Sequence, residues 1–193
     1  MTRVVCYSDF NCPFCYAMHE QLVESGTIAH VEWRGVQHAS HLPVPMKVWQ
    51  GGYAAELRQE VAWVKQLAPA LAISVPPGKP STRRAISAAA AALRQDARRG
   101  EEFVRALYAA FWRDGADLSD AVVLNDLMAR SGIYMDSAPW DDKTIGEQVE
   151  QWDEAWRSTG HSGVPLLIGP EGDQLVGLVS SADVRRFMNR VGS

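Results

Sequence analysis

Two cysteines separated by two residues are the strongest chemical feature of this sequence. They lie in the segment Cys12-Pro13-Phe14-Cys15. Two thiols at this spacing meet only where the chain turns through the first turn of a helix, so both sulfurs would lie at one helix end. Cys12 would then occupy the helix N-terminus, where unpaired N–H groups and the helix dipole favour negative charge and lower a thiol pKa. The spacing therefore predicts a reactive thiolate at Cys12.

The positions within that turn give the two cysteines different predicted roles. The thiolate is the species that attacks a disulfide, so Cys12 is the predicted nucleophile. Cys15 lies one turn further into the helix and would be more buried, where it can resolve a mixed disulfide formed at Cys12. Pro13 fits an early helical position because it has no N–H to leave unpaired. Together these features predict thiol–disulfide exchange.

Metal binding is the alternative interpretation, since half of a zinc site has the same cysteine spacing. His19 follows one turn after Cys15, so Cys12, Cys15 and His19 would offer three ligands and Cys6 a fourth. A structural zinc site usually combines two cysteine or histidine pairs, and the sequence has no second pair. We therefore predict redox chemistry without a metal. His19 is interpreted as a partly buried helix residue, and Cys6 as a small buried residue of a strand.

The composition is that of an ordinary globular protein. A chain of 193 residues with 47% apolar and 22% charged residues suits one domain, or one domain with a large insertion. The net charge of −4 argues against broad electrostatic binding of nucleic acid. No run approaches the ~20 apolar residues of a membrane span, and the N-terminus lacks a secretory signal pattern. We therefore expect a cytoplasmic protein, where paired cysteines indicate catalysis rather than structural disulfides.

The elements around the cysteines follow a strand–helix–strand order. Residues 3–8 are apolar enough for a buried strand, a helix is expected over about residues 12–25, and residues 28–36 are a second strand candidate. This order favours a parallel strand pair joined by a crossover helix. Near the other end of the chain, residues 164–168 and 174–179 are expected to pair as a hairpin. A final helix capped by Ser180 or Ser181 would follow.

The middle of the chain has helical rather than strand periodicity. Helices are expected at about 52–71, 82–98, 101–114, 119–131 and 142–159. Glycines at positions 100, 115 and 132 separate the later helices. We interpret the tryptophan-rich stripes as packing surfaces. The layout is therefore βαβ, a helical block and ββα, with one domain formed by residues 1–40 and 160–193 and a helical subdomain formed by residues 41–159.

These segments resemble the DsbA-like branch of the thioredoxin superfamily, and within it the FrnE-like cytoplasmic members. The resemblance is carried by four segments: Ser8-Asp9-Phe10 before the CxxC pair, Pro80-Ser81-Thr82-Arg83-Arg84-Ala85, Gly115-Ala116-Asp117-Leu118-Ser119-Asp120, and Gly163-Val164-Pro165. It implies an α/β thioredoxin fold with a large all-helical insertion between the βαβ and ββα halves. It also implies a protein disulfide oxidoreductase or isomerase.

The same resemblance assigns residues that position the substrate. The family proline equivalent to Pro165 follows a cis peptide bond and lies against the CxxC disulfide. The backbone of Val164 would then pair with an extended substrate chain, and Pro13 and Phe14 would also contact it. Phe14 stands where the strongly oxidising members have a histidine, which can stabilise the Cys12 thiolate. We therefore expect a milder oxidant, a reductase or an isomerase.

A sister group with the same fold acts on small molecules and leaves a second alternative open. It contains the kappa-class glutathione transferases and the 2-hydroxychromene-2-carboxylate isomerases, which usually carry serine in place of Cys12. His38 and His41 follow the second strand. We interpret them as solvent-exposed loop histidines, with a position in the cleft between the subdomains as the alternative.

The expected partners follow from the same resemblance. They are protein or peptide thiols and disulfides, or glutathione. No permanently bound cofactor is expected. Glutathione as a co-substrate, or a partner reductase, would complete the redox cycle. Neither nucleic acid nor a membrane is an expected partner, and the chain would act as a monomer or a homodimer.

Overall fold

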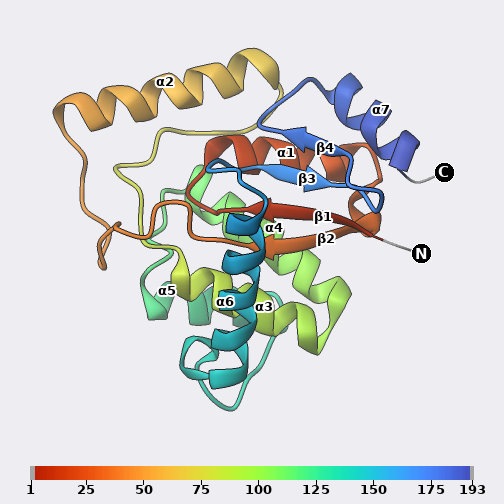
Figure 1. Cartoon of the computed structure of the whole chain (residues 1–193). Coiled ribbons are helices and arrows are strands. Elements are labelled where there is room, and N and C mark those ends of the chain that lie inside the picture. Colours follow the sequence, from red (N-terminus) through yellow and green to blue (C-terminus); the bar gives the residue numbers. More distant parts are fainter. Residues whose placement is uncertain (1–2, 192–193) are drawn as a thin grey trace.

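The computed structural model describes residues 3–191 and contains a four-stranded mixed sheet with helices around it (Figure 1). The strands are β1 (Val4–Ser8), β2 (Val31–Gly35), β3 (Leu166–Ile168) and β4 (Gln174–Val176). Their order in the sheet is β2-β1-β3-β4, with β1 parallel to β2 and antiparallel to β3, and β4 antiparallel to β3. The predicted βαβ unit and C-terminal hairpin are therefore confirmed.

The central strand β1 supplies side chains to two hydrophobic clusters, because successive residues of a strand point to opposite faces. Val4 and Cys6 pack into the cluster formed with α1 (Pro13–Glu24) and α7 (Ser181–Val191). Tyr7 belongs to the larger cluster built with the helices from the middle of the chain. Cys6 is 4% exposed, which confirms its interpretation as a small buried residue.

The middle of the chain is helical, as predicted. Its helices are α2 (Gly51–Leu67), α3 (Arg83–Gln95), α4 (Ala97–Trp112), α5 (Ala121–Arg130) and α6 (Lys143–Ser158). Two short 3-10 turns also occur, η1 (Ile28–His30) before β2 and η2 (Pro139–Asp141) before α6. Helix α3 packs against α4 and α6, α6 contacts β2, and α2 contacts α1. Among the described residues, no helix has the length and apolar character needed to cross a membrane.

The boundary between α3 and α4 differs from the prediction, which placed a break at Gly100. The break is at Asp96, whose side chain caps α4 by accepting a hydrogen bond from the Arg99 N–H at 3.0 Å. Gly100 lies inside α4, where a Cβ would come within 2.6 Å of the Leu93 backbone. Glycine is therefore needed at this position for the close approach of α3 and α4, and not to end a helix.

Other element boundaries shift by a few residues. The helix predicted over residues 52–71 ends at Leu67, and the strand predicted over residues 28–36 begins only after η1. The tryptophans expected to pack are buried at positions 33, 112, 152 and 156, whereas Trp63 on α2 is 49% exposed. Residues 1–2 and 192–193, which the predicted first domain includes, lie outside the described residues.

Candidate functional site

Cys12 lies at the start of α1, as its spacing from Cys15 predicted. It is the N-cap residue, in extended conformation, and Pro13 is the first helical residue. The Cys12 N–H donates to the Asp9 carbonyl at 3.2 Å, and its own carbonyl accepts from the Cys15 and Tyr16 N–H groups at 3.1 and 3.2 Å. The Cys12 sulfur therefore lies at the N-terminus of α1, where the Cys15 backbone N–H helps to lower its pKa.

The second cysteine lies deeper, as expected for a resolving thiol. Cys15 is 1% exposed and Cys12 5% exposed. The Asp9 N–H donates to the Cys15 sulfur at 3.4 Å, and the Ser8 hydroxyl also interacts with that sulfur. Cys12 and Cys15 are both free thiols in this structure.

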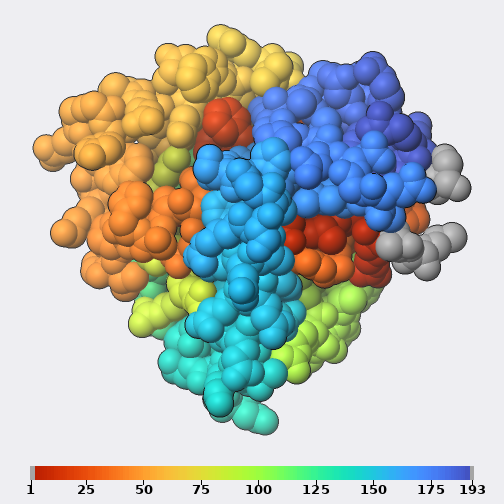
Figure 2. Space-filling view, in the orientation of Figure 1, coloured from red at the N-terminus to blue at the C-terminus, as the bar shows by residue number. Residues whose placement is uncertain are grey.

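The fold brings the CxxC segment against the loop before β3. The Cys12 thiol donates to the Val164 carbonyl at 3.4 Å, although the two residues are separated by 152 positions in the sequence. The Val164–Pro165 peptide bond is cis. Cys12, Cys15, Val164 and Pro165 are thus brought together at one place. Figure 2 shows the first part of α1, in red, at the surface between α2 and the C-terminal segment.

The electrostatic environment separates the two thiols. Burial raises the pKa of Cys12, but the hydrogen bonds from Cys15 and the positive charges of His38 and Lys79 outweigh it, so the Cys12 pKa lies below its ordinary value. For Cys15, burial, the hydrogen bond with Cys12 and the nearby Cys12 charge raise the pKa well above its ordinary value. Cys12 is therefore the more acidic of the two thiols.

His38 corrects the prediction that it lies free in solvent. Its Nδ1 is 2.7 Å from the Asp9 Oδ2 atom, and its backbone N–H donates to the same oxygen at 3.1 Å. The Asp9 side chain is fully buried and also accepts a hydrogen bond from the Thr82 hydroxyl at 2.6 Å. His41, in contrast, is exposed.

Three residues of this site, Asp9, Thr82 and Lys79, had no catalytic or binding role in the sequence prediction. Asp9 and Thr82 were noted only within segments that carry the family resemblance. Lys79 is buried and forms an ion pair with Glu60 of α2 at 2.7 Å. The sole signal in the sequence was the position of Asp9, three residues before Cys12, because backbone turns at such sites bring side chains close to a helix N-terminus.

Phe14 and His19 lie on different sides of α1. Phe14 stacks on Trp63 of α2 with ring centroids 6.5 Å apart. His19 is buried, more so than predicted, with its ring 5.2 Å from the Tyr108 ring. Among residues 3–191, no group lies within hydrogen-bond distance of the His19 Nε2 atom. In the same part of the chain, no three His, Cys, Asp or Glu side chains are grouped to hold a metal ion.

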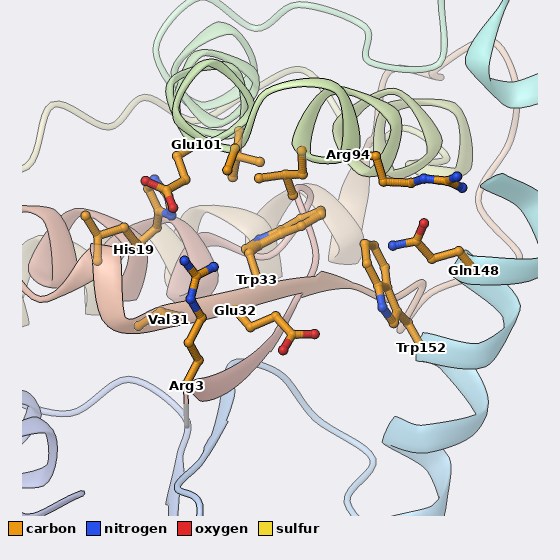
Figure 3. Close-up of a pocket in the computed structure, with 13 residues that line it drawn as sticks. Arg3, His19, Val31, Glu32, Trp33, Arg94, Glu101, Gln148 and Trp152 are labelled. Atoms are coloured by element: carbon orange, nitrogen blue, oxygen red, sulfur yellow. The ribbon is translucent and has the colours of Figure 1, made fainter. Parts of the chain in front are cut away.

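A separate pocket of about 200 Å³ lies away from the cysteines (Figure 3). It is lined by residues of β2, α3, α4 and α6 and by His19, and neither Cys12 nor Pro165 contributes to it. Trp33 lies in the middle of the pocket, with Arg3 and Glu101 at one end and Arg94, Gln148 and Trp152 at the other. It contains no thiol, so the thiol chemistry belongs to the surface at Cys12.

A mixed sheet whose first parallel unit presents a CxxC pair opposite a cis-proline loop, with a helical segment between its halves, has the architecture of a thioredoxin-fold protein. A sequence profile of the DSBA-like thioredoxin domain matches residues 3–189. The chain therefore belongs to the DSBA-like thioredoxin family, as its motifs indicated. A search of curated proteins finds no match.

Solved structures with the same fold include proteins of different activities. A probable DsbA oxidoreductase from Streptomyces coelicolor superposes with a TM-score of 0.79 at 18% identity, covering 100% of this chain and 90% of its own. A 2-hydroxychromene-2-carboxylate isomerase superposes with a TM-score of 0.72 at 14% identity, covering 98% of this chain and 94% of its own. A cytosolic disulfide reductase, DsbM from Pseudomonas aeruginosa with glutathione, superposes with a TM-score of 0.70 at 15% identity, covering 97% of this chain and 98% of its own. At these identities the similarity establishes the fold.

Proposed function

We propose that this protein is a thiol–disulfide oxidoreductase that uses Cys12 as nucleophile and Cys15 as resolving thiol. The observation that carries the proposal is the contrast between the two sulfurs. Cys12 starts a helix, faces the Val164 carbonyl and has a lowered pKa, whereas Cys15 is buried with a raised pKa. Such a pair supplies one thiolate that attacks and one thiol that reacts only after the first bond has formed.

The reaction consists of two exchanges of sulfur–sulfur bonds. The Cys12 thiolate attacks a substrate disulfide, a bond forms between Cys12 and one substrate sulfur, and the other substrate sulfur leaves as a thiolate that takes up a proton. Cys15 then loses its proton and attacks the Cys12 sulfur, which releases the second substrate thiol. The substrate gains two electrons and the enzyme becomes the Cys12–Cys15 disulfide. Two thiols, from glutathione or a partner reductase, return it to the dithiol.

The loop before β3 and the start of α1 are proposed to position the substrate. The Val164 carbonyl lies 3.4 Å from the Cys12 sulfur, so a substrate chain paired with this backbone would bring its disulfide to the nucleophile. Pro165, which has no N–H, follows directly. Pro13 and the half-buried Phe14 form the other side, and the exposed Trp63 extends this apolar surface along α2. We therefore favour protein or peptide disulfides as substrates.

The test is disulfide turnover by cysteine variants. Cys12→Ser should abolish insulin reduction with glutathione as the electron donor. Cys15→Ser should also stop turnover but accumulate a mixed disulfide at Cys12, which mass spectrometry detects. Cys6→Ala is the matched control, because it removes a thiol that is buried on β1 and should turn over at the wild-type rate. Retained turnover in Cys12→Ser would overturn the proposal.

The second candidate is a glutathione-dependent isomerase or transferase of small molecules. It is favoured by the similarity of the fold to the 2-hydroxychromene-2-carboxylate isomerase. Such an enzyme would bind glutathione stoichiometrically and would keep its activity in Cys15→Ser, because no resolving thiol takes part. Loss of all activity in Cys15→Ser would instead support the disulfide exchange.

A further inference from the structure

The Asp9 carboxylate joins three segments that are far apart in the sequence. One oxygen accepts a hydrogen bond from the Thr82 hydroxyl at 2.6 Å, just before α3. The other lies 2.7 Å from the His38 Nδ1 atom and accepts from the His38 backbone N–H at 3.1 Å. Two donors, the Thr82 hydroxyl and the His38 backbone N–H, therefore fix the carboxylate. It can still accept a hydrogen bond from the His38 ring.

The main chain of the same residue contacts both cysteines. The Asp9 carbonyl accepts from the Cys12 N–H at 3.2 Å, and the Asp9 N–H donates to the Cys15 sulfur at 3.4 Å. His38 is thus attached, through one residue, to the turn that sets the geometry of the CxxC pair. The imidazole cannot move away from this turn without breaking its contact with a buried carboxylate.

The charges around His38 favour the imidazolium. Burial disfavours the charged ring, but the hydrogen bond and charge of Asp9 and the charge of Cys12 outweigh burial and the repulsion from Lys79, so the His38 pKa lies above its ordinary value. A further carboxylate, that of Asp153 on α6, accepts a hydrogen bond from the neighbouring Gln37 N–H at 3.1 Å. Arg83 lies 3.7 Å from Asp153 and offsets part of its charge.

We propose that Asp9 and His38 form a positioning pair that holds an imidazolium near Cys12, where its charge stabilises the Cys12 thiolate. This inference rests on the proposed function, in which that thiolate is the attacking species. It replaces the sequence interpretation of Phe14: the stabilising histidine is absent from the CxxC segment, but a histidine from the loop after β2 supplies a positive charge from another direction. Lys79, held by Glu60, adds a second cation to the same thiolate.

Two variants and a matched control test the pair through the reactivity of Cys12. His38→Gln removes the charge but keeps a backbone N–H for Asp9, and Asp9→Asn removes the anion that holds the imidazolium. His41→Gln changes the exposed histidine of the same loop. The rate of Cys12 alkylation by iodoacetamide is measured against pH, with mass spectrometry to assign the modified cysteine.

We expect His38→Gln to move the midpoint of the alkylation profile to higher pH and to lower the rate near neutral pH about tenfold, which is one pKa unit. Asp9→Asn should move it in the same direction, and His41→Gln should match the wild type. Because the thiolate stabilises the reduced form, the same tenfold change lowers the reduction potential of the Cys12–Cys15 couple by about 30 mV. Wild-type midpoints and potentials in both His38→Gln and Asp9→Asn would overturn the inference.

The readouts separate this inference from the proposed function. If the wild type fails to reduce disulfides, the proposed function fails, whereas the alkylation profile still reports the Asp9–His38 pair. If His38→Gln loses turnover but keeps the wild-type profile and potential, the histidine has a purely structural role and the inference is overturned. Should Asp9→Asn be too unstable to purify, His38→Gln decides the outcome, because Asp9 keeps its Thr82 hydrogen bond there.

Discussion

The lowered pKa of Cys12 reflects a balance between burial and several opposing contributions. Burial alone would keep this sulfur protonated, because a thiolate loses its hydration in the protein interior. The helix start, the hydrogen bonds from Cys15 and the charges of His38 and Lys79 act in the opposite direction. No single residue supplies the whole effect, so changing one of them should alter the thiolate content without abolishing it.

Phe14 offers the clearest prediction at the scale of one residue. Phe14→His places an imidazole at the start of α1, where the family resemblance implies that it stabilises the Cys12 thiolate. We expect the Cys12 pKa to fall and the enzyme to become a stronger oxidant. A tenfold stabilisation of the reduced form would raise the reduction potential by about 30 mV, measured by equilibration with glutathione.

Phe14→Gln is the control for this change, because it also removes the stacking on Trp63 but carries no charge. The two variants should therefore lose the same packing and differ in potential. Equal potentials in Phe14→His and Phe14→Gln would show that a histidine at this position does not act on Cys12.

At the scale of elements, the packed helices α3 and α4 hold the segments around Cys12 in place. α3 begins at the end of the segment that carries Lys79 and Thr82, and α4 carries Tyr108, whose hydroxyl is hydrogen-bonded to Ser8 at the end of β1. The Trp112 side chain, also on α4, donates to the Phe10 carbonyl at 2.8 Å. The turn before Cys12 is therefore fixed by helices that come much later in the sequence.

Gly100→Ala tests the packing of these two helices. The added methyl group would lie 2.6 Å from the Leu93 backbone, which cannot rotate away. We expect a loss of about 2–3 kcal/mol in the free energy of unfolding, the upper part of the range for overpacked sites. Urea denaturation followed by circular dichroism measures it.

Gly146→Ala is the matched control on α6. Among the described residues, no neighbouring atom outside its own helix lies within 4 Å of the added methyl group. Alanine favours the helix by about 0.5–1 kcal/mol over glycine, so this variant should be more stable than the wild type. A comparable loss of stability in both variants would contradict the role given to Gly100.

At the scale of the whole molecule, a buried histidine lies where α1 packs against a helix from the middle of the chain, and its charge state limits stability. His19 on α1 is buried against Tyr108 of α4, and burial lowers its pKa to about 4. The unfolded chain has an ordinary histidine pKa near 6.5. Between these two values the unfolded state binds a proton that the folded state does not, so stability falls as the pH decreases from 6.5 to 4.

His19→Phe should remove this part of the pH dependence. The wild type is expected to lose about 2 kcal/mol of unfolding free energy between pH 6.5 and pH 4.5 through His19, since one unit of pH between the two pKa values changes it by up to about 1.4 kcal/mol. The variant should lose correspondingly less, as measured by urea denaturation at pH 6.5 and pH 4.5. The exposed His30 provides the control, and His30→Gln should keep the wild-type slope. Equal slopes in wild type and His19→Phe would contradict the effect of burial.

Much of this architecture was predictable because it depends on local signals. The start of α1 at Cys12 and Pro13, the strand–helix–strand order and the helical middle of the chain all follow from short-range patterns of apolar residues, proline and glycine. The break predicted at Gly100 was wrong because a glycine that allows close helix packing has the same local appearance as a glycine that ends a helix. Only the position of Leu93, in the preceding helix, distinguishes the two.

By itself, the sequence predicted thiol chemistry at Cys12 and Cys15, because two thiols at this spacing on a helix start are defined by local geometry. The tertiary structure decided their surroundings. It placed Val164 at the Cys12 sulfur and moved His38 from a predicted solvent loop to the buried Asp9 carboxylate. Electrostatic interactions act through space, so the charge that tunes a thiolate can come from any segment that the fold brings near. For this reason, the phenylalanine at position 14 does not by itself determine the pKa of Cys12.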